Sequence, residues 1–202
     1  MSKGFLIVIE GIDGSGKTTQ VELLQAWEVI SFPRYEDNLY GKLIKKYLEG
    51  EFGKADPYLI ALAYAGDRTL ANPLIESWLS GGKVVIANRY VSSSKAHLSA
   101  NLPVEKREEF MRWIDKLEYE TNGIPKEDLT ILLDVDPKKG QANVEGDLHE
   151  DDLNHLIKAR KIYLELSKAE ENWRVVNCME GGKMARKEKI HKQITAILNN
   201  LI

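Results

Sequence analysis

Three glycines, a lysine and two threonines follow an apolar run near the start of the chain. Residues 11–18 read GIDGSGKT, which fits the pattern G-x-x-x-x-G-K-[ST]. The run FLIVI precedes this segment and a helical pattern follows it, which is the context that the pattern requires. Glycines let successive backbone N–H groups point inward around an anion, and the start of a helix adds positive potential. The segment therefore predicts a phosphate-binding loop.

Two side chains of this loop have expected tasks. Lys17 is expected to reach the outer phosphates of a nucleoside triphosphate, and the Thr18 hydroxyl is expected to hold Mg²⁺. The loop alone does not separate GTPases, motor ATPases and small-molecule kinases. The sequence has no N-K-x-D signature, which argues against a switch GTPase, and it is small for a typical motor. The residues expected to bind the nucleotide are Gly11, Ile12, Asp13, Gly14, Ser15, Gly16, Lys17, Thr18 and Thr19.

A parallel sheet is needed to place this loop. Five β-branched or aliphatic runs alternate with longer helical patterns, which predicts βαβ units with helices on both faces of the sheet. We therefore expect a three-layer α/β fold of the P-loop NTPase type, with one domain over residues 1–202 and a small lid. The expected strands are Phe5–Glu10, Glu28–Phe32, Val84–Asn88, Leu129–Val135 and Trp173–Asn177.

Local signals mark the ends of several helices. The pairs Asp56-Pro57 and Asn72-Pro73 each offer an N-cap followed by proline, which predicts two helix starts, and Gly81-Gly82 predicts a stop. A long helix is expected over 150–168. Its apolar face would carry Leu153, Leu156, Ile157 and Leu164, and the packing face of the terminal helix would carry Ile190, Ile194, Ile197 and Leu198.

The connection between the first helix and the second strand is unusually short. The helical pattern TTQVELLQAW runs directly into EVISF, although such a connection normally takes ~2 to 6 residues. Either the helix ends early, or a short loop present in relatives is missing here.

The composition narrows the class of protein. A chain of 202 residues suffices for one globular domain, and a net charge of -3 gives no overall basic field for nucleic acid or an anionic membrane. A single cysteine, Cys178, excludes an intramolecular disulfide and fits a reducing compartment, so we expect a cytoplasmic protein. The apolar runs are too short for a signal-peptide core or a membrane span.

The motifs taken in order resemble the thymidylate kinase family over nearly the whole chain. The resemblance implies a homodimeric enzyme that transfers a phosphoryl group from ATP to dTMP with Mg²⁺. The motifs that carry the resemblance are EGIDGSGKTTQ (10–20), FPRY (32–35), YAGDR (64–68), NRYVSSSKAH (88–97), LLDVDP (132–137) and DLHEDD (147–152).

The resemblance also implies roles for residues on the acceptor side. Asp13 would contact the sugar 3′-hydroxyl of dTMP and the water shell of the metal. Tyr64 and Arg68 are one helical turn apart, so they share a face. In the family the aromatic residue stacks on the pyrimidine and the arginine donates to its O4. A surface cation-π pair is the alternative.

Further roles follow from the same resemblance. Arg89 follows an expected strand, at the end where such sheets bind ligands, and would clamp the acceptor phosphate. Ser93 and Ser94 would bond the base, and His97 stands where many relatives have a tyrosine that crowds the sugar 2′ position. Phe32 would lie under the sugar and Arg34 near its phosphate.

The chain departs from the family pattern in two places. Asn88 replaces the aspartate of the common Asp-Arg-Tyr motif, which removes a negative charge near the expected metal. The lid is expected at about 137–150, and neither it nor the phosphate loop contains the arginine that stabilises the transferring phosphoryl group in relatives. Lys139 and Arg160 are the candidate replacements, and truncation of the lid is the competing explanation. An arginine on an apolar helix face must find an anionic partner or reach solvent.

Two alternative functions stay open. The chain could phosphorylate another nucleotide or a deoxynucleoside, or it could be a regulatory protein that kept the phosphate loop and lost turnover. Asn88 and the missing lid arginine favour the second alternative. His149, His155 and His191 show no metal-binding spacing, and we expect them in solvent.

Overall fold

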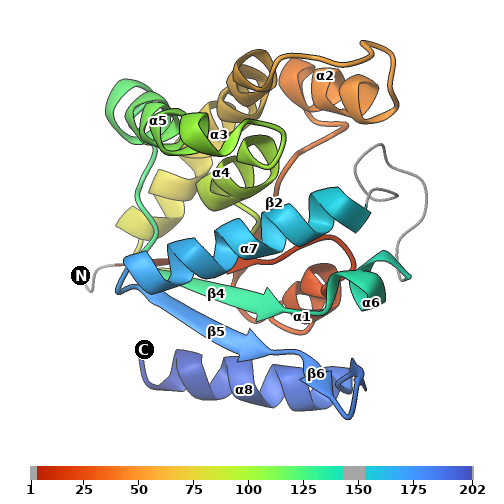
Figure 1. Ribbon diagram of the computed structural model, residues 1–202. Coiled ribbons are helices and arrows are strands. Elements are labelled where there is room, and N and C mark those ends of the chain that lie inside the picture. The colour runs from red at the N-terminus through yellow and green to blue at the C-terminus, as the bar shows by residue number, and fades with distance from the viewer. Residues whose placement is uncertain (1–3, 143–152, 202) are drawn as a thin grey trace.

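A five-stranded parallel sheet forms the centre of the structure, a computed structural model that describes residues 4–142 and 153–201. Its strands lie in the order β2-β3-β1-β4-β5, with helices on both faces (Figure 1). All five expected strands are confirmed, to within a residue at each end. They are β1 (Phe5–Glu10), β2 (Glu28–Ser31), β3 (Val84–Asn88), β4 (Leu129–Asp134) and β5 (Trp173–Asn177).

Helices cover the sheet on either side, and a short antiparallel hairpin follows β5. The helices are α1 (Lys17–Glu22), α2 (Leu39–Leu48), α3 (Pro57–Ser80), α4 (Val91–Ser99), α5 (Val104–Asp115), the π-helical segment η1 (Lys116–Thr121), α6 (Pro137–Gln141), α7 (Leu153–Ala169) and α8 (Lys187–Asn199). The hairpin consists of β6 (Met179–Glu180) and β7 (Lys183–Met184).

Alternate residues of β1 divide the interior into two cores. Leu6 and Val8 pack with buried residues of α2, α3 and α5, whereas Ile7 and Ile9 pack with those of α1 and α8. This follows from the two-residue period of a strand whose faces are both covered. In the view of Figure 1, α7 and α8 lie on either side of β4 and β5.

The short connection after α1 exists because the helix ends early. Beyond Glu22 the backbone bonds become those of tight turns, with Leu23 N donating to Gln20 O at 3.1 Å and Trp27 N to Leu24 O at 3.2 Å. These turns supply the connection to β2 that the sequence pattern lacked.

One expected helix start is wrong. Asp56 caps α3 by accepting from Tyr58 N at 2.8 Å, and the helix ends at Ser80 before Gly81 and Gly82, as expected. Pro73, however, lies inside α3 rather than at the start of a second helix. Proline lacks the N–H that donates a helical hydrogen bond. The buried side chains of Ala71 and Ile75, two residues before and two residues after Pro73, keep the helix continuous.

The buried face of α7 is also shifted from the expected one. The structure buries His155, Leu156, Ala159, Ile162 and Tyr163, while Ile157 is 47% exposed. The expected start of this helix, at 150, lies outside the described residues. The expected packing face of α8 is confirmed, since Ile190, Ile194 and Leu198 are buried and Ile197 packs against the same core.

The carboxyl ends of β1, β3 and β4 meet at one edge of the sheet. Ile9 pairs with Asn88, and Glu10 pairs with Leu132, so the residues that follow these strands emerge side by side. The fold therefore brings the phosphate loop, Arg89 and Asp134 to the edge where parallel sheets bind ligands. Among the described residues, no helix has the length and apolar character that a membrane span requires.

Candidate active site

The phosphate loop curls tightly between the end of β1 and α1. Gly11, Gly14 and Gly16 have positive φ angles of 149°, 72° and 88°. A Cβ at Gly14 would lie 2.0 Å from the carbonyl oxygen of Gly140 in α6, so the loop leaves no room for a side chain there. Glycine is required both for the backbone angles and for this close approach.

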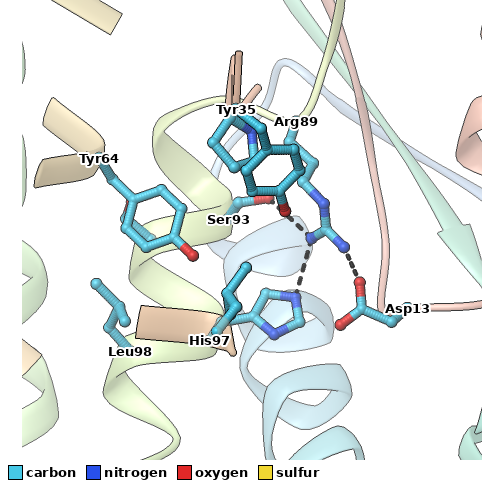
Figure 2. A pocket seen from close by; sticks show the side chains of 10 residues that line it. Asp13, Tyr35, Tyr64, Arg89, Ser93, His97 and Leu98 are labelled. Atoms are coloured by element: carbon cyan, nitrogen blue, oxygen red, sulfur yellow. Dashed lines mark hydrogen bonds and ion pairs between the residues drawn. The ribbon is translucent and has the colours of Figure 1, made fainter. Parts of the chain in front are cut away.

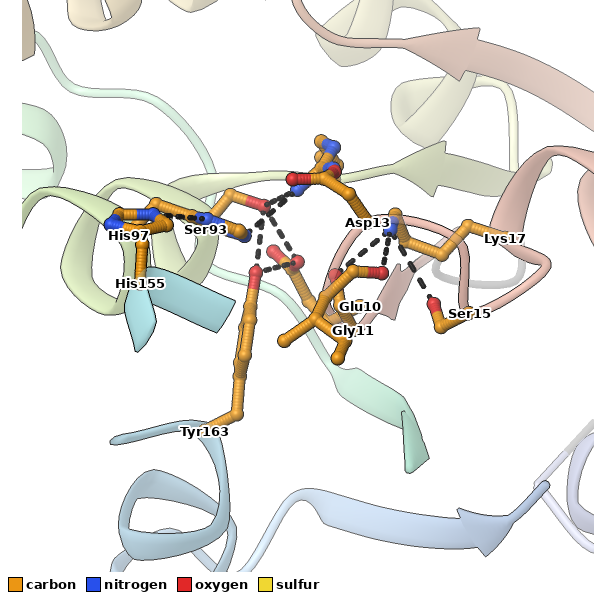
Figure 3. Close-up of polar contacts among 11 residues, drawn as sticks. Glu10, Gly11, Asp13, Ser15, Lys17, Ser93, His97, His155 and Tyr163 are labelled. Carbon is orange, nitrogen blue, oxygen red and sulfur yellow. Dashed lines mark hydrogen bonds and ion pairs between the residues drawn. The ribbon is translucent and has the colours of Figure 1, made fainter. Parts of the chain in front are cut away.

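The Lys17 side chain lies within the curve of the loop. Its Nζ donates to the carbonyl oxygens of Gly11 and Ile12, at 2.9 and 2.8 Å, and lies 3.5 Å from Ser15 Oγ (Figure 3). Lys17 is only 6% exposed. A positive charge is therefore held at the centre of the loop by three oxygen atoms of the chain itself.

An ion pair joins the loop to the end of β3. The Arg89 guanidinium pairs with the Asp13 carboxylate, and its second terminal nitrogen, NH1, lies 3.2 Å from His97 Nε2 and 3.4 Å from Ser93 Oγ (Figure 2). Arg89 has a φ of 65°, a region that residues other than glycine rarely adopt. Its backbone N–H is held by Ile9 O at 3.1 Å, which fixes the turn out of β3.

A buried carboxylate supports this turn. Glu10 is fully buried and accepts from Tyr90 N at 3.0 Å, from Ser93 Oγ at 2.7 Å and from Tyr163 OH at 2.8 Å (Figure 3). Burial, and then the charge of Glu10, raise the pKa of the Tyr163 phenol well above its usual value. The tyrosine therefore stays protonated and donates to Glu10.

Beside the ion pair lies a pocket between α3, α4 and the segment after β2. Figure 2 shows Tyr64 of α3 across the pocket from Arg89, with Ser93 and His97 between them. The lining residues are Asp13, Pro33, Tyr35, Leu48, Tyr64, Arg89, Ser93, Ser94, His97 and Leu98. Six expected substrate-binding residues, Asp13, Tyr64, Arg89, Ser93, Ser94 and His97, thus come together from three separate segments of the chain.

A groove continues from this pocket along the phosphate loop. It contains Lys17, Thr18 and Thr19 together with Phe32, Asn88 and Met184. Asp13 and Arg89 line both the groove and the pocket. The two cavities therefore adjoin at the ion pair.

Arg68 lies beneath the pocket lining and is almost completely buried. Its Nε donates to Glu118 Oε1 at 3.0 Å, its NH1 to the carbonyl oxygen of Tyr90 at 3.2 Å and its NH2 to Ser94 Oγ at 2.8 Å. Burial disfavours the charged form, but the carboxylate of Glu118 outweighs it and raises the pKa of Arg68 above its ordinary value. The shared helix face with Tyr64 is present, but Arg68 contacts the pocket through Ser94.

The two residues after β2 that are expected to contact the acceptor lie in different surroundings. Phe32 lines the groove and is 4% exposed. Arg34 turns toward α3, where its Nε lies 3.0 Å from Asp67 Oδ1 and its backbone N–H donates to Asp67 Oδ2 at 2.8 Å. Asp67 is buried, so this ion pair fastens the segment to α3.

Thr18 and Asn88 face the same groove and could hold a metal ion with a nucleotide. Thr18 is exposed, whereas Asn88 is 9% exposed. Its Oδ1 has no hydrogen-bond partner among residues 4–142 and 153–201. Within those ranges no group of three or more carboxylate, histidine or cysteine side chains is arranged to bind a metal by itself. The available donors fit an ion bound mainly through phosphates.

The candidate lid cations lie on two helices that follow β4. Arg160 of α7 forms a bidentate pair with Asp134, at 2.6 and 2.9 Å, so of the two expected outcomes, an anionic partner or solvent, it has the anionic partner. This pairing raises the pKa of Arg160. Lys139 is exposed on α6. The expected lid begins with α6, and its residues from 143 on lie outside the described residues, as do DLHEDD and His149.

The prediction that His155 lies in solvent is wrong. It is 2% exposed, because α7 turns it toward α4, where its Nε2 lies 3.3 Å from His97 Nδ1 (Figure 3). His191 is half-buried on α8, with Nε2 3.4 Å from Thr195 Oγ1, so it is not fully in solvent either.

Sequence reasoning missed Glu10, Tyr163, Glu118 and His155. Glu10 had a usable signal, since a carboxylate at the end of the first strand must reach the binding edge of the sheet. Tyr163 lies seven residues after Leu156, a spacing that places both on one helix face. Glu118 and His155 depend on contacts between distant segments, which the sequence pattern does not reveal.

Comparisons with known proteins agree with this arrangement. The sequence profile of the thymidylate kinase family matches residues 9–194. A probable thymidylate kinase of Pyrobaculum aerophilum is 34% identical, with 97% of each chain covered, and one of Pyrococcus abyssi is 33% identical, with 98% of this chain and 97% of the relative covered. The solved structure of thymidylate kinase from Candida albicans superposes with a TM-score of 0.80 at 26% identity, covering 99% of this chain and 93% of the other. The chain therefore belongs to the thymidylate kinase family.

Proposed function

We propose that this protein transfers the γ-phosphoryl group of ATP to dTMP and forms dTDP and ADP, with Mg²⁺ as the metal. The single observation that carries the proposal is that the groove and the pocket adjoin at the ion pair between Asp13 and Arg89. The groove along the phosphate loop suits the triphosphate of a donor, the pocket beside Tyr64 suits a nucleoside monophosphate, and Asp13 and Arg89 line both. Membership of the family supports the choice of nucleotides.

The reaction requires positioning and charge neutralisation rather than a general base. The attacking atom is a phosphate oxygen of dTMP that is already ionised at neutral pH, so no proton has to be removed from it. Lys17 would neutralise charge on the donor side and Arg89 on the acceptor side. Closure of a lid over the groove would exclude water, which would otherwise hydrolyse ATP.

Mg²⁺ fits the polar atoms at the end of β3. The Thr18 hydroxyl lines the same groove as Asn88 Oδ1, which has no hydrogen-bond partner in the described part of the chain, and Asp13 provides the nearby carboxylate. The bound ion would offset the negative charge of the phosphates. Thr18 would hold it directly, while Asn88 and Asp13 would hold its water shell.

The remaining nucleotide contacts rest on the family resemblance. Tyr64 would stack on the pyrimidine, and Ser93 and Ser94 would bond its edge. Arg68 would act on the base from behind Ser94, which it contacts at 2.8 Å. His97 would lie beside the sugar. Phe32 would lie under the sugar, and Arg34 would need to exchange Asp67 for the phosphate in order to reach it.

We also propose a homodimer in the cytoplasm. Four leucines of α3, at 46 to 62% exposed, lie on one face of the helix around Gly66. A second copy of the same face is a suitable partner, since a two-fold axis can bury one helix against its own copy. The four residues are Leu59, Leu62, Leu70 and Leu74.

Acceptor specificity is tested by a panel of dTMP, dUMP, dCMP, dGMP, AMP and the free nucleosides. The panel matters because the Candida albicans thymidylate kinase has broad substrate specificity. Each acceptor is incubated with ATP and Mg²⁺, and the phosphorylated product is separated and quantified. The proposal expects the highest kcat/KM for dTMP. A higher value for another acceptor identifies a different kinase of the same fold, and tight binding of ATP and dTMP without dTDP identifies a regulatory protein.

A further inference from the structure

A buried histidine lies behind the acceptor pocket and contacts one of its lining residues. His155 of α7 lies beside His97 of α4, with ring centroids 5.5 Å apart and an angle of 29° between the ring planes. Its Nε2 lies 3.3 Å from His97 Nδ1, and its Nδ1 lies 3.2 Å from Oδ1 of Asn101, in the turn after α4. His155 therefore fits between two side chains one helical turn apart.

The hydrogen bonds that link Arg89, His97, His155 and Asn101 can run in only one direction. Arg89 NH1 lies 3.2 Å from His97 Nε2, and a guanidinium donates but does not accept. His97 Nε2 must accept, so the proton of this ring is on Nδ1. That proton faces His155 Nε2, which must accept in turn and leaves the second proton on Nδ1 of His155. The chain of donors ends at Asn101 Oδ1.

Both rings are therefore neutral in this arrangement and carry their proton on Nδ1. A proton on Nε2 of His97 would face the N–H groups of Arg89, and a proton on Nε2 of His155 would face the N–H of His97. The hydrogen bond made by one ring nitrogen decides the state of the other. Tyr163 restricts the His97 ring further, since their ring centroids lie 5.7 Å apart in an edge-to-face contact.

We propose that His155, with Asn101 behind it, is a positioning residue that fixes the tautomer and orientation of His97 and through it aims the Arg89 guanidinium at the acceptor phosphate. The role of Arg89 in this statement rests on the proposed function. Asp13 holds one terminal nitrogen of Arg89, and His97 holds the other. The plane of the guanidinium is thus set from two sides before the acceptor binds, which reduces the orientational freedom lost on binding.

Replacement of His155 separates positioning from folding. His155→Leu removes the acceptor for His97 Nδ1–H, whereas His155→Gln supplies an amide oxygen for His97 and an amide N–H for Asn101. We expect His155→Leu to raise the KM for dTMP about ten-fold, with kcat changed less than about three-fold and the KM for ATP unchanged. We expect His155→Gln to recover most of the loss. Equal increases in both KM values would overturn the proposal.

A double-mutant cycle tests whether His155 acts through His97. His97→Leu should raise the KM for dTMP, and adding His155→Leu to it should cause no further increase. Additive effects would show that His155 acts independently, which contradicts the proposal. His191→Leu is the matched control, because His191 is a partly buried histidine on α8 and its loss should leave both KM values unchanged. If His155→Leu does not fold, Asn101→Ala replaces it, because Asn101 is exposed.

The tautomers provide a measurement that does not depend on the reaction. Long-range ¹H–¹⁵N spectra of the uniformly labelled protein should show His97 and His155 as neutral rings with the proton on Nδ1, and His155→Leu should alter the His97 pattern. A proton on Nε2 of His97 would overturn the proposal even in an active enzyme. If dTMP is not a substrate but the tautomers are as stated, the proposed function fails while the positioning of Arg89 stands.

Discussion

The ion pair between Asp13 and Arg89 places opposite charges at the point where the donor groove meets the acceptor pocket. Both side chains are largely buried, at 13% and 20% exposed, so each would leave an uncompensated charge if the other were removed. A phosphate group that enters either cavity can replace the Asp13 carboxylate as the partner of Arg89. The side chain at position 88, one residue before Arg89, determines how much negative charge faces a metal ion in the groove.

Asn88→Asp is expected to strengthen Mg²⁺ binding. The carboxylate adds a charge where an amide oxygen now lacks a partner among the described residues, and the shape of the side chain hardly changes. We expect the Mg²⁺ concentration for half-maximal rate to fall roughly five-fold, about 1 kcal/mol, in a titration at fixed ATP and dTMP.

A matched control comes from Asn72, whose amide oxygen is also buried and unpaired among the described residues but lies on α3. Asn72→Asp should leave the Mg²⁺ midpoint unchanged. An unchanged midpoint and unchanged turnover in Asn88→Asp would show that position 88 does not address the metal.

At the scale of the elements, α6 packs directly against the phosphate loop. Gly14 and Gly140 leave no space for side chains between them, since a Cβ at Gly140 would lie 2.7 Å from the carbonyl oxygen of Asp13. The first helix of the expected lid is thus packed directly on the loop that it would have to regulate. Movement of α6 would first displace the backbone of Asp13.

Gly140→Ala is expected to displace the phosphate loop. The obstructing atom is a backbone oxygen, so relief requires movement of the loop or of α6, at a cost of about 1 to 3 kcal/mol in stability. We expect a fall of roughly ten-fold in kcat/KM for ATP and a lower Tm. Gly81→Ala is the control, because its new Cβ meets no atom closer than 3.4 Å. Wild-type kinetics in Gly140→Ala would show that this contact is not tight in solution.

The difference between local and distant contacts explains how much of the fold and of the site the sequence could predict. The strands and the phosphate loop were predictable because hydrophobic runs and glycine spacing are local properties. Pro73 misled because its helix is stabilised by burial against the sheet, which outweighs one missing hydrogen bond. The place of Arg68 beneath Ser94 was not predictable, because its ion-pair partner Glu118 lies fifty residues away in the sequence. No local pattern reveals such a partner.

At the scale of the whole molecule, the exposed leucine face of α3 predicts association. Two copies should give a particle of twice the chain mass in light scattering. We expect the double variant Leu62→Glu with Leu70→Glu to be monomeric, because it places charges in the centre of the proposed contact. Val104→Glu, at a residue that is 73% exposed on α5, should remain dimeric. A monomeric wild-type protein would contradict the homodimer.

The fate of the γ-phosphoryl group tests the central claim most directly. ³¹P NMR of the protein with ATP, Mg²⁺ and dTMP should show dTDP and ADP formed in equal amounts, with little inorganic phosphate. Lys17→Ala should lower the rate by more than about ten-fold, a loss above ~1.4 kcal/mol in transition-state stabilisation, while a thermal melt confirms that it folds. Release of inorganic phosphate with dTMP unchanged, or binding of both nucleotides without dTDP, would contradict the assignment of this protein as a dTMP kinase.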